Sequence, residues 1–172
     1  MGRPLDSARI GDHIDRLYRA AWALTGSRED AEDLVQETFA RVLAKPRFLR
    51  GDDDLGYLMR VLRNTFVSRH RARERRPRVA AVPEDAELAD PVVGRRPEEA
   101  VLAREVFAHI AALPEGFRDA LVAVDVAGLS YEEASRLLGV KVATITSRLF
   151  RARAQVAAGM DPERAGVLKE QR

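Results

Sequence analysis

Residues 129–153, LSYEEASRLLGVKVATITSRLFRAR, decide the fold. Ser130 and Glu133 have the Ser-x-x-Glu spacing of a capping box, in which each side chain satisfies a backbone N–H at the start of a helix. Gly139 is the residue type that most readily takes the left-handed conformation just past a helix end. The stretch therefore predicts a short helix over 131–138, a glycine turn and a second helix, which is the helix-turn-helix arrangement.

The second of these helices has two chemically different faces. No acidic residue occurs from 140 to 157, and at 100° per residue Phe150 points away from the predicted core. A helix that lies against phosphates should lack carboxylates, and an outward aromatic ring can contact a thymine methyl group. DNA binding is the favoured interpretation, and a charged surface helix with one stray Phe is the alternative. Apolar spacing predicts that five residues are buried: Val142, Ile145, Leu149, Ala152 and Val156.

Composition favours a helical protein, and the distribution of charge favours one that binds a polyanion at two places. Of 172 residues, 46% are hydrophobic and only 6% aromatic, and there is no cysteine, which excludes disulfides and Cys-ligated metals. The net charge is +2, but residues 47–78 hold ten basic and four acidic groups, and residues 140–157 hold four basic groups. Two separate basic blocks indicate two contacts with a nucleic acid, although solvated faces are the simpler alternative.

The first half of the chain also has helical patterns. Gly26 should end a helix over 13–25, and Ser27 should cap the next helix, with Asp30 three residues later. Trp22 is most simply a core residue. Two further groups of apolar positions are predicted to be buried, one in the helix that ends near residue 44 and one in a helix over 55–73: Ala31, Leu34, Val35, Val42 and Leu43, and Leu58, Val61, Leu62 and Thr65.

Residues 77–97 break both composition and pattern. Prolines stand at 77, 83, 91 and 97, and the apolar residues between them keep no helical or alternating period. The segment is interpreted as a flexible linker between two domains. Fully extended, about 20 residues reach roughly 65 Å, so the two basic blocks could contact separate sites on one duplex.

Several other features are assigned no chemistry. The three histidines, His13, His70 and His109, are far apart and lack ligand spacing, and the Asp52–Asp54 run is expected to be solvated. No Gly-rich phosphate loop and no Ser/His/Asp constellation occurs, so no catalytic residue, metal or cofactor is expected. There is no signal peptide or membrane-spanning apolar run, which makes a cytoplasmic protein the expectation.

At this point the residues resemble a known family. The stretch 30–39, DAEDLVQETF, looks like the core-binding helix of the extracytoplasmic-function (ECF) sigma factors. Leu113-Pro114, the 128–133 stretch GLSYEE and the 147–153 stretch SRLFRAR resemble the helix-turn-helix domain of the same family. The two matches cover about residues 13–76 and 98–157, in the expected order.

The resemblance implies an all-α protein with two small helical domains. They would be a sigma region 2 bundle over 10–76 and a sigma region 4 helix-turn-helix domain over 98–158, with a linker at 77–97 and a tail at 159–172. Such a protein would bind core RNA polymerase, through the clamp helices of the largest subunit and the flap of the second-largest. It would direct promoter-specific initiation by reading −10 and −35 elements and promoting DNA melting. An anti-sigma factor would be a further partner.

The resemblance also implies roles for particular residues. The polar stripe formed by Asp33, Gln36 and Glu37, which would otherwise be taken for a solvated face, matches the docking positions for core polymerase. The −10 region would be read by Arg50, Tyr57, Arg60, Asn64 and Arg71, with further arginines at 63, 69, 73, 75 and 76 on the DNA backbone. The −35 region would be read by Lys141, Thr144, Thr146, Ser147, Arg148, Phe150, Arg151 and Arg153.

The chain departs from the family pattern at several positions. Tyr57 stands in place of a usual Trp, Ser68 in place of a frequent Asp, and Lys141, Ala143 and Thr146 in place of a frequent Pro, Gly and basic residue. The promoter sequence therefore does not transfer from other members. The competing hypothesis is a dimeric helix-turn-helix regulator that binds a palindrome without polymerase, but it leaves the first domain unexplained.

Overall fold

The computed structural model describes residues 3–4, 7–44, 48–49, 53–75 and 97–161. The predicted all-α fold is confirmed: helices dominate, and two-residue strands β1 (Arg3–Pro4) and β2 (Phe48–Leu49) form one antiparallel pair. Residues up to 75 are called the first half and residues 97–161 the second half. The first half holds α1 (Ser7–Gly11), α2 (Ile14–Thr25), α3 (Arg28–Ala44) and α4 (Asp54–Glu74). The second half holds α5 (Pro97–Ala111), α6 (Glu115–Leu121), the π-helical turn η1 (Val122–Val126), α7 (Tyr131–Leu138) and α8 (Val142–Met160).

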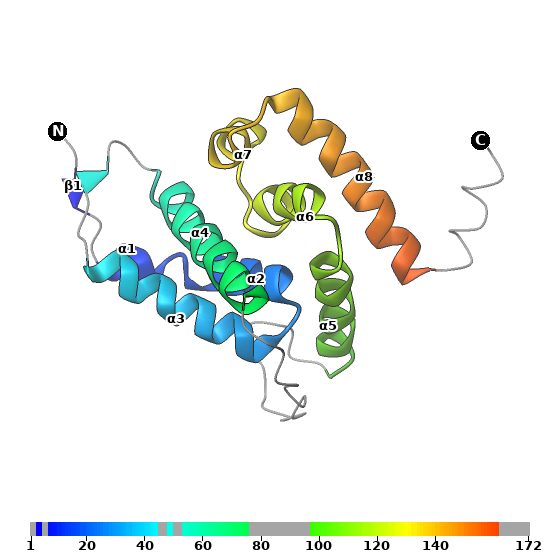
Figure 1. Ribbon diagram of the computed structural model, residues 1–172, viewed down its shortest axis with the longest axis horizontal. Helices are drawn as coiled ribbons and strands as arrows, with labels where there is room; N and C mark the ends of the chain where they lie inside the picture. Colours follow the sequence, from blue (N-terminus) through cyan, green and yellow to red (C-terminus); the bar gives the residue numbers. More distant parts are fainter. Residues whose placement is uncertain (1–2, 5–6, 45–47, 50–52, 76–96, 162–172) are drawn as a thin grey trace.

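The first half is a bundle in which α2, α3 and α4 pack on one another (Figure 1). Gly26 ends α2 in the left-handed conformation, with φ of 72°, and the backbone N–H of Asp30 donates to Ser27 Oγ at 3.3 Å. Both predicted boundary signals are therefore confirmed. The centre of the bundle consists of fully buried side chains from all three helices, with Trp22 beside them: Leu17, Leu34, Leu58, Met59 and Leu62.

Two expectations in the first half are wrong. Leu43 was expected in the core of α3 but is 55% exposed, because the core face follows Leu34, Thr38 and Val42 and the next residue lies 100° around the helix. Asp54 was expected to be solvated with its neighbours but is buried, and its Oδ2 lies 3.3 Å from Arg9 Nε.

The second half contains the predicted helix-turn-helix. Ser130 Oγ accepts from the backbone N–H of Glu133 at 3.2 Å, and the Glu133 carboxylate accepts from the backbone N–H of Ser130 at 2.7 Å. Gly139 ends α7 with φ of 66°, as expected. In α8, Ile145, Leu149 and Ala152 are buried and Val156 is half-buried, as predicted. Val142 was expected to be buried as well but is 38% exposed, because it is the first residue of the helix.

One element was expected to be a continuous helix over 116–127 and is not. It divides into α6 and the π-helical turn η1, in which the backbone N–H of Ala127 reaches the carbonyl of Val122, five residues earlier. A π turn widens the helix by one residue and re-aims the side chains after it. Here it directs Asp125 toward α8.

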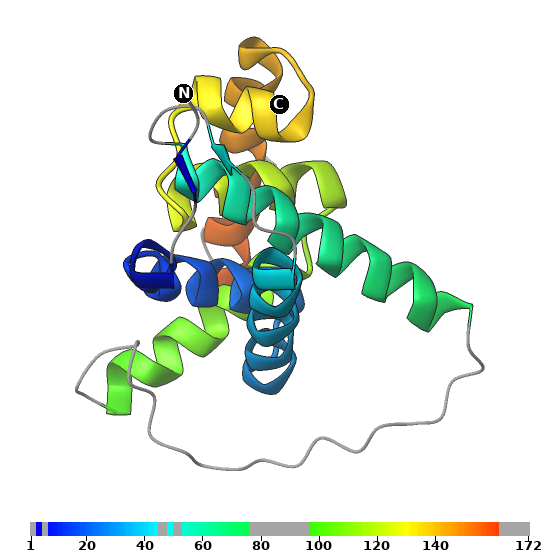
Figure 2. The same cartoon turned by 90° about the vertical axis from the view of Figure 1, so that its left-hand side faces the viewer.

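The two halves pack against each other along one side of α2 and α4 (Figures 1 and 2). The Trp22 ring lies 5.0 Å from the Phe107 ring of α5, at an interplanar angle of 51°. The linker that was predicted to separate the halves lies outside the described residues, except for Pro97, which begins α5. The compact arrangement of the halves had no signal in the sequence pattern.

Candidate functional site

The outer face of α8 presents the side chains that the sequence assigned to a nucleic acid. Phe150 is 76% exposed, and Thr146, Ser147 and Arg151 are exposed beside it. The hydroxyl groups of Thr146 and Ser147 donate to the carbonyls of Val142 and Thr144, at 3.1 Å in both cases. Each hydroxyl oxygen therefore keeps its acceptor capacity toward an outside donor, such as a base amino group. This face can combine apolar, acceptor and cationic contacts.

Three residues of α8 that were predicted to contact DNA are less available than those four. Thr144 and Arg148 are half-buried, and the Arg148 guanidinium lies against Gly116 in α6. Arg153 donates two hydrogen bonds to the Asp125 carboxylate of η1, and these raise the pKa of Arg153 above its ordinary value. Arg153 thus ties α8 to its own domain rather than projecting freely. Lys141, the residue before α8, is exposed at its N-terminal end.

A second surface lies on α4. Tyr57, Arg60, Asn64 and Arg71 fall within about 60° of one another around the helix at 100° per residue. Tyr57 is half-buried and the other three are exposed. In the part of the chain that the structure describes, the side chains of those three make no ion pair or hydrogen bond. Arg50, the fifth residue predicted for this surface, lies outside the described residues. The α4 surface is a polar, cationic strip beside one aromatic ring.

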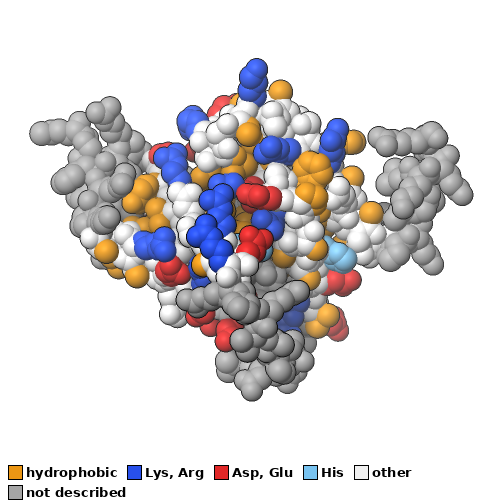
Figure 3. Space-filling view, viewed as in Figure 1, with side chains coloured by type: hydrophobic (Ala, Val, Ile, Leu, Met, Phe, Trp, Pro, Cys, Tyr) orange, Lys and Arg blue, Asp and Glu red, His pale blue; other side chains and the backbone are white. Residues whose placement is uncertain are grey.

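The other described arginines of the same helix are turned elsewhere, with the exception of Arg75 at its end. Arg63 reaches the second half, where it contacts Asp119. Arg69 and Arg73 face α3 and contact its carboxylates. The space-filling view shows cationic side chains over α4 directly beside acidic ones (Figure 3). The described arginines of α4 therefore fall into three groups, which are exposed on the α4 strip, paired with α3 carboxylates, or paired with Asp119 of the second half.

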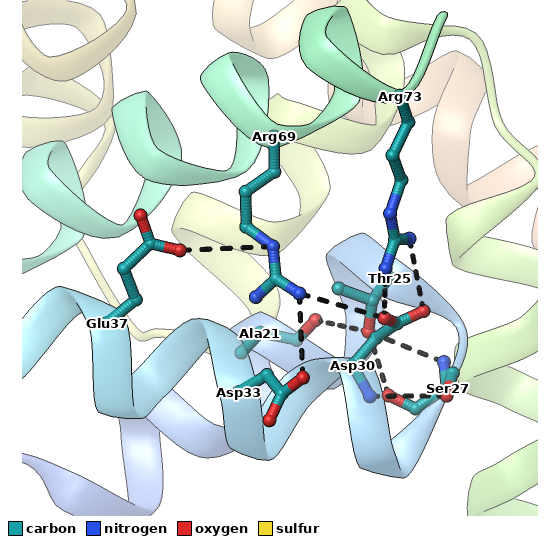
Figure 4. Close-up of polar contacts among 8 residues, drawn as sticks. All are labelled: Ala21, Thr25, Ser27, Asp30, Asp33, Glu37, Arg69 and Arg73. Carbon is teal, nitrogen blue, oxygen red and sulfur yellow. Dashed lines mark hydrogen bonds and ion pairs between the residues drawn. The ribbon is translucent and has the colours of Figure 1, made fainter. Parts of the chain in front are cut away.

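The acidic stripe on α3 forms the third surface. Asp33 and Gln36 are exposed and Glu37 is half-exposed. Arg69 extends from α4 between three carboxylates, with N–O distances of 3.9 Å to Asp30, 3.7 Å to Asp33 and 3.9 Å to Glu37 (Figure 4). These distances exceed hydrogen-bond length, so Arg69 acts as a shared counter-ion rather than a tight partner. A cationic partner surface can compete with Arg69 for the two outer carboxylates.

Asp30 behaves differently from the outer two carboxylates. It receives Arg73 Nη2 at 2.6 Å and Nη1 at 3.4 Å, and this hydrogen bonding raises the pKa of Arg73. At the adjacent end of α2, the Thr25 hydroxyl donates to the Ala21 carbonyl at 2.9 Å, next to the Ser27 cap (Figure 4). Asp30 is therefore part of the structure that holds the α2–α3 corner to α4, whereas Asp33 and Glu37 remain accessible.

Sequence reasoning missed the acidic partners of Arg63 and Arg153. Asp119 and Asp125 were not singled out, although each is an acidic residue within or beside the apolar stretch of residues 120–127. That placement is the only signal that could have marked them. Among the described residues, no cluster of three His, Cys, Asp or Glu side chains could hold a metal ion, and no helix is both long and apolar enough to cross a membrane.

Both halves of the chain match families of known proteins. Residues 10–76 match the family model of Sigma-70 region 2, and residues 103–156 match that of Sigma-70 region 4. The chain is 40% identical over 151 residues to the ECF RNA polymerase sigma factor SigE of Mycolicibacterium smegmatis, with 86% of this chain and 58% of that relative covered. It is 38% identical over 147 residues to the ECF RNA polymerase sigma factor EcfG of Rhodopseudomonas palustris, with 84% and 79% covered.

Two solved structures share the fold. The sigma factor RpoE of Bartonella quintana, crystallised with the anti-sigma factor NepR, has a TM-score of 0.67 and 26% identity, and covers 89% of this chain and 94% of that one. CnrH in complex with the cytosolic domain of CnrY has a TM-score of 0.62 and 23% identity, and covers 89% and 85%.

Proposed function

This chain belongs to the extracytoplasmic-function family of RNA polymerase sigma factors, and from that membership we propose that it binds core RNA polymerase and directs initiation at promoters with matching −10 and −35 elements. The observation that carries the proposal is the separation of three surfaces on one small fold. They are an acidic stripe on α3, a cationic strip on α4 and an acid-free outer face on α8. A dimeric regulator would need only the last of these.

The docking contact is assigned to Asp33, Gln36 and Glu37. Their exposure and their loose sharing of Arg69 support this assignment, because the carboxylates can exchange one guanidinium for another without a buried rearrangement. Asp30 is left out, because its short contacts with Arg73 make it a structural residue. The clamp helices of the largest polymerase subunit are the proposed partner.

The −10 contact is assigned to Tyr57, Arg60, Asn64 and Arg71 on α4, together with Arg50. A cationic strip beside an aromatic ring suits a strand whose bases leave the stack, since arginines hold phosphates and a ring can stack on a freed base. Capture of unstacked bases favours the melted state of the DNA, which offsets a melting cost on the order of a few kcal/mol. The proposed role therefore includes both recognition and opening.

The −35 contact is assigned to the outer face of α8. We assign Phe150, Ser147 and Thr146 to contacts with base edges. We assign the exposed cations Lys141 and Arg151 to contacts with phosphates. Arg153 is assigned a positioning role, because Asp125 holds its guanidinium. The remaining members of this surface are Lys141, Thr144, Arg148 and Arg151.

Further partners follow from the same membership. We propose that the second half also contacts the flap of the second-largest polymerase subunit, and that an anti-sigma factor controls the chain in the cytoplasm. The structure of the sigma factor RpoE with the anti-sigma factor NepR supports control of this kind. The protein is proposed to be a binding subunit that supplies no catalysis of its own.

A pull-down with purified core RNA polymerase tests the proposal. The Asp33→Ala, Gln36→Ala, Glu37→Ala triple variant should lose binding that the wild type shows. A Glu32→Ala variant of the same helix should keep it, because Glu32 lies outside the stripe and pairs with Arg28. DNA binding by the chain alone, as a dimer on a palindrome and with no binding of core polymerase, would favour the regulator hypothesis instead.

A further inference from the structure

One ion pair joins the two halves of the chain. Both Nε and Nη2 of Arg63 on α4 lie 2.7 Å from Oδ2 of Asp119 on α6, and the two residues are 56 positions apart in sequence. The Asp119 side chain is only 3% exposed, whereas that of Arg63 is 28% exposed. Glu115 Oε1 adds a longer contact to the same guanidinium, at 3.5 Å. Arg63 therefore covers the Asp119 carboxylate, which has almost no access to water.

The surroundings of Asp119 make this pair sensitive to separation of the halves. Burial raises the pKa of Asp119, and the charge and hydrogen bond of Arg63 oppose that rise. Without Arg63, the buried Asp119 carboxylate would keep, among the described residues, only Arg118, whose Nε lies 3.8 Å from Asp119 Oδ1, as a counter-charge. Removing the close partner of a buried charge is far more costly than losing a surface pair. Loss of Arg63 from this position should therefore drive Asp119 toward water, and so favour separation of α6 from α4.

Apolar contacts accompany the ion pair. Trp22 of α2 packs on Phe107 of α5, and α5 approaches so closely that a Cβ on Gly26 would lie 2.9 Å from the Ala111 Cβ. The Arg118 guanidinium lies 5.0 Å above the Phe66 ring, which also joins α6 to α4. Contacts between the halves thus come from three helices of the second half and from η1, which packs on α2.

This compact arrangement cannot serve both promoter elements at once. A compact chain of 172 residues is about 40 Å across. Elements centred near −10 and −35 lie about 25 base pairs apart, or roughly 85 Å along a duplex with a turn of about 34–36 Å. The α4 and α8 surfaces can therefore contact both elements only after the halves separate.

We propose that Arg63 and Asp119 form an intramolecular latch that holds the free chain closed, with the Asp119 carboxylate in the place that a DNA phosphate takes after opening. The proposal rests on the proposed function for the identity of the DNA. Arg63 lies about 60° around α4 from Arg60, at the border of the cationic strip. Opening the latch adds one cation to that strip. The closed chain thus conceals part of its own DNA-binding surface.

The absence of cysteine from the sequence permits a direct test on the full chain. Glu29→Cys in α3 and Glu132→Cys in α7, both at exposed positions, accept a fluorescent donor and acceptor that report the distance between the halves. Asp119→Asn and Arg63→Gln should each lower energy transfer, with the open-to-closed ratio rising on the order of tenfold or more. Asp125→Asn, which breaks an arginine pair within the second half, should leave transfer unchanged.

A DNA measurement tests the second part of the proposal. The slope of log affinity against log salt for a plain duplex should be steeper for Asp119→Asn than for wild type by about 0.9, the value for one added phosphate contact. The Asp119→Asn, Arg63→Gln double variant should lack this increase. An equal slope in both variants would overturn the phosphate role of Arg63.

Two outcomes would overturn the latch itself. The first is unchanged transfer in both single variants, with helix content by circular dichroism equal to wild type. The second is an open wild-type chain. Should Asp119→Asn fail to fold, Arg63→Gln alone decides, because Arg63 is the more exposed partner. These readouts use the free chain, so a failure to bind core polymerase would contradict the proposed function without affecting them.

Discussion

Arg153 of α8 donates two hydrogen bonds, of 2.8 and 2.7 Å, to the two carboxylate oxygens of Asp125 in η1. The pair fixes the long helix that carries Phe150 against the π-helical turn. Its geometry is bidentate, but both side chains are partly exposed, so its direct worth is about 1 kcal/mol or less. Its larger effect is on the orientation of α8.

Asp125→Ala should therefore weaken −35 binding although Asp125 itself is assigned no DNA contact. Arg153→Ala should have a similar effect, and the double variant should be no worse than either single variant, because both remove the same pair. Binding of a −35 duplex by the holoenzyme, measured for all four proteins, checks this. Additive losses would show that Arg153 contacts DNA independently of Asp125.

Phe150→Ala should leave stability within about 0.5 kcal/mol of wild type, because the ring is exposed. It should nevertheless weaken −35-dependent initiation by on the order of 1–2 kcal/mol if the ring contacts a thymine methyl group. Gln155→Ala, at another exposed position of α8, is the matched control. Transcription in vitro from promoters with and without a −35 element, together with thermal unfolding, makes the comparison. Equal loss on both promoters would contradict the assignment.

Gly26→Ala should destabilise the chain more than Gly139→Ala. Both glycines have positive φ, 72° and 66°, which costs a residue with a Cβ roughly 1–2 kcal/mol. Only at Gly26 does the added Cβ meet another group, the Ala111 Cβ at 2.9 Å, whereas nothing lies within 4 Å at Gly139. The excess should be about 1–3 kcal/mol, as for other overpacked sites. Urea unfolding of the two variants measures it, and equal losses would show that the halves do not press together at this point.

The capping box predicts a dependence of stability on pH. Hydrogen bonds from the backbone and side chain of Ser130 hold the pKa of Glu133 below its ordinary value of 4.5. A carboxylate with a lowered folded pKa adds stability above its unfolded pKa and loses it as pH falls through the folded value. Glu133→Ala should therefore lower the melting temperature at pH 7, by an amount that corresponds to about 1 kcal/mol or less. The difference from wild type should shrink below about pH 4.5. A difference that stays constant down to pH 3.5 would contradict a role for the ionised carboxylate.

Local patterns in the sequence predicted the elements of the second half well. Ser130, Glu133 and Gly139 act within a few residues of themselves, so their hydrogen bonds and backbone angles depend little on the rest of the chain. Periodicity likewise placed Ile145 and Leu149 in the core and Phe150 outside it. It failed at Leu43, where two adjacent apolar residues competed for one face, and at residues 116–127, where a π turn interrupts an otherwise regular apolar period.

The sequence by itself determined most of the longer helices, the caps at Ser27 and Ser130 and the family resemblance, because periodicity and capping are local and each motif is carried by neighbouring residues. Only the tertiary structure decided which arginines of α4 remain available. Arg60 and Arg71 stay exposed, Arg69 joins the acidic stripe and Arg63 meets Asp119 from 56 residues away. The sequence pattern cannot show which of these arginines are paired, because all carry the same charge. The partner of each guanidinium depends on the rotation of α4 and on the packing of the two halves.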